Sequence, residues 1–437
     1  MISREEISQY KKENLIFKKQ IEKQTGKTVG QLYSERTKRV RDAIELRTPD
    51  RVPFMVLVEP HSYAGIPKSA AFYDPIALKR TMRKMAVDLQ PDMSEPGFPS
   101  CGAAMTELDV QNCVWPGGPK PQDYEYQFIE GEYMKEDEYD MFLNDPSGFM
   151  IRRYLPRVYA ALKPLAKLPP LDSMFMGFDG LTPMFTSPEF REMVKHLAKA
   201  GKQTQEFRKC VGDANEELAQ LGFPPFARFA PGGVGGAPFD TVTSFLRGMK
   251  GSMLDMYRRP DKLLQACEKI LDRRIAYAIP ANPTSIDGPP RVGLPLWRGD
   301  PVFMSDAQFK KFYWPGLKKS LQTHVDLGYV PVPFFEAPFG DRLECLLELP
   351  KGKILASIEA ADAVRAKEIL GGHTSLLVRC PNTCKLWTIG QLESFIKDLI
   401  DKSGQNGGLI LVIKKPDSAA IEDMRAMLQS ISDYGRY

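Results

Sequence analysis

The second half of the chain alternates short apolar runs with segments of helical spacing, and this alternation constrains the fold more than any other feature. Apolar runs occupy 329–336, 353–359, 375–380 and 408–413. Helices are expected over 306–327, 341–349, 361–370 and 389–402, since a Ser305-Asp306 start, Pro350 and a Gly371-Gly372 pair mark helix ends. Strands that alternate with helices over short connections are typical of a parallel α/β fold.

Four further runs, at 53–59, 88–94, 227–231 and 291–297, bring the candidate strands to eight. This number predicts a single (β/α)8 barrel, although periodicity alone leaves a doubly wound sheet open. The charged segment 2–32 is expected to form a solvated helix. We therefore interpret residues 1–33 as an N-terminal helical extension, residues 34–437 as the barrel, and the irregular stretch 115–171 as an insertion after the second strand.

Composition excludes several classes of partner. The 437 residues include 59 basic and 55 acidic side chains, and the net charge of +4 is too small to indicate nucleic acid. No stretch approaches the roughly 18 uncharged apolar residues of a membrane span, and the charged N-terminal segment lacks the apolar core of a secretory signal. Seven scattered cysteines indicate reduced thiols. We expect a cytoplasmic protein, and its charged arm could join two copies as a homodimer.

Three successive strands end in side chains that bind metals. Glu336 ends the run 329–336, Glu359 ends 353–359 and Cys380 ends 375–380. Since chemistry belongs at the carboxyl ends of barrel strands, these residues would surround one mouth, and three ligands leave a coordination position open for catalysis. Alternatively, each Glu caps a helix and Cys380 is a small core residue. Glu344, Cys345 and Cys384 are rival ligands, whereas His373 follows a helix and belongs to the opposite end.

Aromatic and glycine-rich segments offer a second kind of site. His61 follows the first strand and Trp297 ends the fourth, so both could line a pocket for an aromatic substrate. Either could equally be structural. The glycine-rich run 231–240 lacks the G-x-G-x-x-G order, which makes dinucleotide binding a poor explanation. Close approach of a bulky ligand or partner is a better use of these glycines.

Short motifs along most of the chain resemble the uroporphyrinogen decarboxylase superfamily. The motifs form five groups along the chain: residues 35–40 and 48–53; Phe239-Asp240, 246–248 and 255–260; 303–305 and 312–315; 407–411; and 434–437. The resemblance spans 34–437 and implies the (β/α)8 barrel. True uroporphyrinogen decarboxylases carry an arginine-rich loop after the first strand, where this chain reads VLVEPHS from Val56. A substrate with many carboxylates would face Glu59 unpaired, so that activity is not expected.

The other large branch of the superfamily contains cobalamin-dependent methyltransferases with zinc at the barrel mouth. Its thiol-methylating members carry His-x-Cys after strand five, where this chain has Glu336-Ala337-Pro338. Glu336, Glu359 and Cys380 look instead like the zinc ligands of methyltransferases that act on aryl methyl ethers. The resemblance thus implies zinc-dependent transfer of a methyl group from a methoxylated aromatic to cob(I)alamin on a separate corrinoid protein. Glu336 and Glu359 would be catalytic, while His61, Trp297 and Phe335 would hold the ring.

Other functions remain open from the sequence. The enzyme could run the opposite half-reaction, from methylcobalamin to a thiol or folate. A metal-free decarboxylase or lyase would use Glu336 and Glu359 as acid and base, and Cys380 would be inert. A non-catalytic protein that handles or reactivates corrinoids would use the mouth only for docking.

Overall fold

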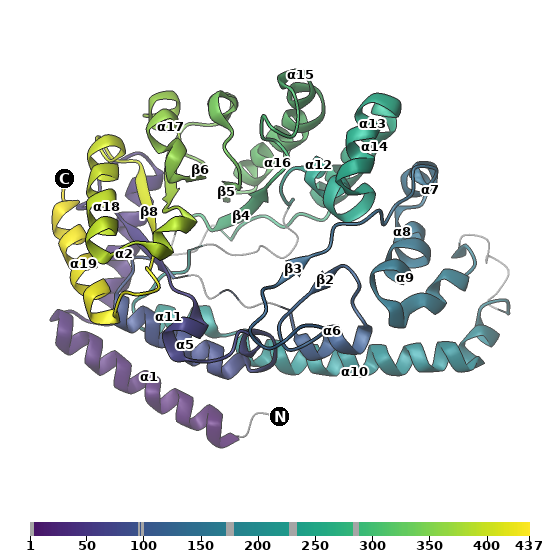
Figure 1. Ribbon diagram of the computed structural model, residues 1–437, viewed down its shortest axis with the longest axis horizontal. Helices are drawn as coiled ribbons and strands as arrows, with labels where there is room; N and C mark the ends of the chain where they lie inside the picture. Colours follow the sequence, from purple (N-terminus) through teal and green to yellow (C-terminus); the bar gives the residue numbers. More distant parts are fainter. Residues whose placement is uncertain (1–3, 95–96, 98–99, 172–178, 227–233, 283–287) are drawn as a thin grey trace.

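A curled parallel sheet forms the centre of the protein, with helices along its outer side (Figure 1). The computed structural model describes residues 4–94, 97, 100–171, 179–226, 234–282 and 288–437. The strand order is β1-β8-β7-β6-β5-β4, and every pair is parallel. The strands are β1 (Phe54–Leu57), β4 (Arg291–Leu296), β5 (Val330–Phe335), β6 (Leu355–Glu359), β7 (Ser375–Arg379) and β8 (Leu409–Lys414). This half-barrel is consistent with a TIM-like fold and confirms six of the predicted strands.

The other two predicted strands have different outcomes. The prediction at 88–94 is wrong over most of its length, because Asp88 and Leu89 end a helix and only Ser94 forms an isolated parallel bridge, to Pro225. The prediction at 227–231 lies outside the described residues. Even so, the backbone N–H of Asp92 donates to Phe54 O at 2.9 Å, and that of Phe226 donates to Ser94 O at 2.9 Å. Segments 92–94 and 224–226 therefore continue the sheet beyond β1, although they are not strands.

The helices that follow each later strand confirm the expected alternation. The predicted helix at 341–349 is of the 3-10 type, since it spans η7 (Gly340–Glu348). The α-helices from residue 188 onward are α10 (Pro188–Val211), α11 (Ala214–Gln220), α12 (Pro238–Thr241), α13 (Gly248–Arg258), α14 (Pro260–Ala276), α15 (Asp306–Gln308), α16 (Trp314–Asp326), α17 (Ala363–Leu370), α18 (Ile389–Ser403) and α19 (Ile421–Tyr434). None of the helices in the described ranges is long and apolar enough to cross a membrane.

The two faces of the sheet bury different residues, because side chains alternate along each strand. Leu376, Val378 and Cys380 belong to the core between the sheet and the outer helices. Leu377 and Ile410 belong to a second core on the concave face, where they pack with Val40, Ala43 and Ile44 of α2 (Val29–Ile44). That core also contains the first residues of β5 and β6, so α2 covers the amino ends of the strands. Among the described residues, α2 does not reach the carboxyl ends of these strands.

The N-terminal segment is less solvated than its charge suggests. It forms two helices, α1 (Arg4–Thr25) and α2, separated by a turn in which Thr28 and Gln31 form a capping box. Tyr10 is buried on α1, and the Arg83 guanidinium lies 3.8 Å from the centre of its ring. The predicted limit of the extension, between residues 33 and 34, thus falls inside α2.

The predicted insertion, residues 115–171, consists of short elements that pack against the barrel helices. It contains β3 (Gln127–Phe128), α7 (Tyr139–Asn144), α8 (Pro146–Phe149), η1 (Met150–Tyr154), α9 (Leu155–Val158) and η2 (Ala160–Lys167). The elements before it are α3 (Pro60–Ala64), α4 (Ala70–Tyr73), α5 (Pro75–Leu89), α6 (Gly102–Leu108) and β2 (Cys113–Val114), which pairs with β3. The buried Arg247 donates to Asp255 at 2.6 Å and to the backbone oxygen of Met134 at 2.8 Å, while Tyr139 donates to the same Asp255 at 2.8 Å. The insertion is therefore held to α13 by hydrogen bonds to the buried Arg247–Asp255 ion pair.

Candidate functional site

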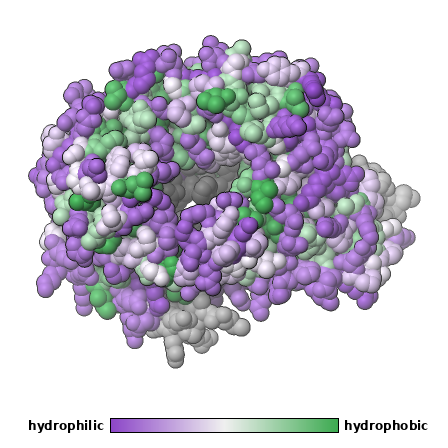
Figure 2. Space-filling model, viewed as in Figure 1, coloured by the Kyte–Doolittle hydropathy of each residue, from purple (hydrophilic) through white to green (hydrophobic). Residues whose placement is uncertain are grey.

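The carboxyl ends of β5, β6 and β7 direct polar side chains into the concave side of the sheet. Glu336 follows Val332 and Phe334 at the two-residue spacing of a strand, and Glu359 likewise follows Leu355 and Ser357. Arg379 follows Leu377 in the same way. Figure 2 shows this view of the molecule hollowed near its centre, inside the curve of the sheet. We call the open end lined by these residues the mouth.

The two carboxylates lie beside a cation. Glu359 and Arg379 are partners in the β6–β7 register, and Arg379 Nε lies 3.9 Å from Glu359 Oε1. The Arg379 guanidinium also lies 4.1 Å from the centre of the Phe334 ring. The Glu336 side chain is exposed, yet desolvation by its neighbours raises its pKa, while the charges of Arg379 and Arg298 oppose the shift. Glu336 is therefore an acid that holds its proton to a higher pH than an ordinary glutamate.

Two further polar groups face the mouth. Lys414 ends β8 on the concave side, and its Nζ donates to Asn382 Oδ1 at 2.8 Å. The Ser357 hydroxyl is buried and has no hydrogen-bond partner within the described part of the chain. Arg379, Lys414 and Ser357 are not among the predicted site residues. The sequence carries no signal for them, because the strands are apolar on both faces and do not show which residues point inward.

Cys380 does not join the two glutamates. It lies on the outer face of the sheet with no exposed surface, and burial raises the pKa of its thiol to about 12. The Cys380 side chain thus lies on the opposite face of the sheet from Glu336 and Glu359, and the three side chains do not converge on one ion. No group of three or more His, Cys, Asp or Glu side chains in the described ranges is placed to hold a metal ion. The residues present therefore do not fit the zinc site that the resemblance implies.

The rival ligands are dispersed as well. Cys384 is buried, and its thiol donates to Lys414 O at 3.6 Å on the helix side of β8. Glu344 is exposed on η7, and Cys345 is half-buried on the same helix. The structure thus brings together only the two carboxylates of the predicted ligand set.

The three predicted ring-binding residues have separate environments. Trp297 follows β4, and its Nε1 donates to Ser244 Oγ at 2.7 Å. Phe335 is buried on the outer face, where its ring centre lies 4.6 Å from that of Phe339. His61 lies on α3 with about a third of its side chain exposed, 32%, and its Nδ1 is 3.9 Å from a Glu59 carboxylate oxygen. The inward aromatic residue of β5 is Phe334 rather than Phe335.

Asp240 fixes the loop after β4. Its buried carboxylate accepts hydrogen bonds from the backbone N–H groups of Trp297 at 3.3 Å and Arg298 at 3.1 Å, and from the Tyr313 hydroxyl at 2.8 Å. Burial raises the pKa of Asp240 to about 7, against the effect of these donors. Asp240 is therefore a positioning residue for Trp297 and Arg298.

The described glycines of the run 231–240 serve the packing of the chain. A Cβ atom on Gly236 would lie 3.1 Å from Pro295 O, so this residue allows a close approach to β4 rather than to a ligand. Residues 231–233 lie outside the described residues.

An aromatic pocket lies beside the mouth. It has a volume of about 920 Å³ and is bounded by the β2–β3 hairpin, α6 and α10. Phe245 lines the pocket, and its ring meets that of Trp297 edge to face at 6.4 Å. A smaller pocket of about 140 Å³ contains Glu59 and His61 and shares Phe72 and Tyr126 with the larger one. The β1 and β4 ends of the mouth are thus linked to one aromatic region.

Comparisons with known proteins bear on the fold. No protein-family model matches the chain, and no curated protein matches it. A solved structure of a methyltransferase from Methanosarcina mazei matches with a TM-score of 0.54 and 15% sequence identity, over 91% of this chain and 98% of that chain. The likeness covers nearly all of both chains and supports the barrel-like α/β fold.

Proposed function

We propose that the protein is a methyltransferase that moves a methyl group from a methoxylated aromatic to the cob(I)alamin of a separate corrinoid protein. The observation that carries the proposal is Glu336, an acid of raised pKa at an open mouth beside aromatic residues. The fold shared with a methyltransferase adds support. We further propose that the helix-covered sheet closes into the eight-stranded barrel of that class, since segments 92–94 and 224–226 extend it from β1.

The side chains of the mouth suit cleavage of an aryl methyl ether. Cob(I)alamin, when the partner brings it, supplies the nucleophile that accepts the methyl group. The methyl–oxygen bond breaks, and the proton of Glu336 moves to the aryl oxygen, so that a neutral phenol leaves instead of a phenolate. Arg379 and Arg298 then stabilise the Glu336 carboxylate. Because Glu336 protonates the leaving oxygen, the proposal contains no step through zinc, whose predicted ligands do not converge.

Formation of the product phenol, catechol, from 2-methoxyphenol with reduced cobalamin under argon tests the proposal. Glu336→Gln keeps the size of the side chain and removes the proton, so the rate should fall by about 100-fold or more. Glu344→Gln, at an exposed position of η7, is the matched control and should keep the wild-type rate. Wild-type activity in Glu336→Gln, or no phenol from the wild-type protein, would contradict the proposal.

A metal-free decarboxylase or lyase is a second candidate. The observation that favours it is the pair of cations, Arg379 and Lys414, on the concave side, because such charges bind a substrate carboxylate. Release of carbon dioxide from an aromatic carboxylate without any corrinoid would favour this candidate over methyl transfer.

A further inference from the structure

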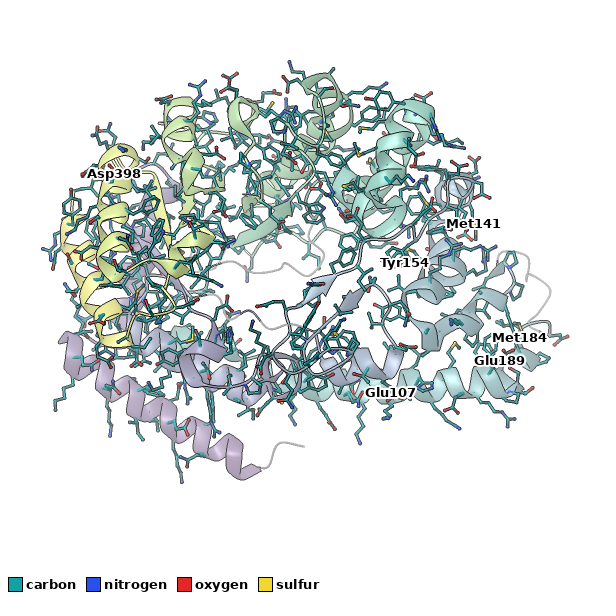
Figure 3. All side chains as sticks on the ribbon, in the orientation of Figure 1. Glu107, Met141, Tyr154, Met184, Glu189 and Asp398 are labelled. Atoms are coloured by element: carbon teal, nitrogen blue, oxygen red, sulfur yellow. The ribbon has the colours of Figure 1, made fainter. Side chains whose placement is uncertain are left out.

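The larger aromatic pocket is built from parts that are held firmly together. Figure 3 shows Glu107 of α6 beside α10, where its carboxylate lies 2.7 Å from His196 Nδ1 and 2.5 Å from Lys199 Nζ. The Cys101 thiol donates to Gln203 O of α10 at 3.7 Å. These contacts join two walls of the pocket to each other. The pocket therefore does not depend on a ligand to assemble it.

The third wall is the β2–β3 hairpin, which supplies aromatic faces. Tyr126 stacks on Phe72, with ring centres 6.3 Å apart and 17° between the ring planes. Phe128 of β3 meets Phe245 edge to face at 5.2 Å. Phe207 projects from α10 and completes the aromatic lining. Such walls favour a flat ligand that can stack on them.

The volume indicates a ligand of more than one ring. A cavity of about 150 Å³ is enough for benzene, and pockets for drug-sized molecules range from about 300 to 1,000 Å³. At about 920 Å³ the pocket would be mostly unfilled by a single methoxylated ring. Two or more linked or fused rings would fill it better.

The charge of the lining indicates an anionic group on the ligand. Arg208 is the one ionic side chain among the described residues that line the pocket, and it lies on the exposed edge of α10. Within the described chain it forms no ion pair. Asn112 and Thr204 add neutral polar groups. A carboxylate or sulfonate at the edge would therefore meet Arg208 while the rings lie against the apolar walls.

The pocket adjoins the mouth, because one of its wall residues contacts a residue at the end of β4. Phe245 contacts Trp297, and Trp297 lies next to Glu336 because the backbone N–H of Glu336 donates to Leu296 O at 3.0 Å. We infer that this pocket binds the part of the substrate remote from the methoxy group, and that the substrate is an aromatic of two or more rings with an anionic group. The inference names a substrate class and so rests on the proposed function.

Fluorescence titration with 1-anilinonaphthalene-8-sulfonate, an aromatic anion, tests the pocket without any methyl transfer. Thr204→Phe places a ring inside the pocket and should weaken binding at least tenfold. Gln205→Phe, at the next and exposed position of α10, adds the same ring outside the pocket and should bind like the wild type. Arg208→Gln should weaken binding several-fold, and Arg208→Lys should restore most of it. If Thr204→Phe unfolds, Val211→Trp blocks the same pocket.

The outcomes separate the inference from the proposed function. Equal binding by the wild type and both blocking variants, or no binding by the wild type, would overturn the inference. Binding that Thr204→Phe abolishes supports it even if no methoxylated aromatic is turned over, in which case the proposed function fails alone. If every variant turns over 2-methoxyphenol faster than two-ring anionic methyl ethers, the inferred substrate class is wrong. The proposed methyl transfer would still stand in that case.

Discussion

At the scale of single residues, which side of a strand a residue faces decides its chemistry. Cys380 ends one apolar run and Phe335 stands just before the Glu336 that ends another, so both look like site residues in the sequence, yet both face the outer helices. Arg379 and Phe334, one position earlier, face the concave side. A shift of one residue moves a side chain to the opposite face of a sheet. Strand ends could be predicted from the sequence, but the face could not, because the runs are apolar on both faces.

Asp240 allows a prediction about pH at this scale. Its pKa of about 7 lies above the ordinary 3.8, so the native state retains a proton that the unfolded chain releases. Its contribution to stability is full below the unfolded pKa and is lost as the pH rises to about 7. Asp240→Asn mimics the protonated acid. Relative to the wild type, its free energy of unfolding should therefore increase by about 2–3 kcal/mol between pH 5 and pH 7.

Urea unfolding at both pH values checks this expectation. Asp261→Asn, at an exposed position of α14, is the control and should show no such trend relative to the wild type. If the difference in the free energy of unfolding between Asp240→Asn and the wild type is the same at both pH values, Asp240 does not have a raised pKa in the native state.

At the scale of elements, an ion-pair network joins α2 to the start of β1. The fully buried Asp92 accepts from Arg39 at 2.5 Å and from Arg51 at 2.7 Å, and the Phe54 N–H donates to it at 2.9 Å. Arg39 also pairs with the exposed Asp50 at 2.6 Å. Arg39, Asp50 and Arg51 belong to the motifs at 35–40 and 48–53, so these motifs maintain the fold rather than the mouth.

The network predicts a difference between two similar substitutions. Asp92→Asn leaves two arginines short of a buried counter-charge and should lower the free energy of unfolding by about 3–5 kcal/mol. Asp50→Asn removes a partner that is 64% exposed and should cost about 1 kcal/mol or less. Urea denaturation of both variants measures these values. Equal, small effects would show that the network contributes little to stability.

At the scale of the whole molecule, the sequence predicts the order of strands and helices better than it predicts the pockets. Buried parallel strands are nearly continuous apolar runs, and helix caps and glycines mark the ends between them, so local patterns were sufficient. The pocket was not predictable in the same way. Its walls come from Phe72, Tyr126, Phe207 and Phe245, which lie far apart in the chain and meet only through the packing of the insertion against α10.

The dependence of phenol formation on pH tests the central claim, that Glu336 acts as the acid at the mouth. We predict that the rate falls as the pH rises through the raised pKa of Glu336, because the carboxylate cannot donate a proton. In Arg379→Gln this fall should move to higher pH, since the positive charge of Arg379 lowers the Glu336 pKa. A rate that instead rises with pH over this range, or a fall at the same pH in Arg379→Gln, would contradict the account.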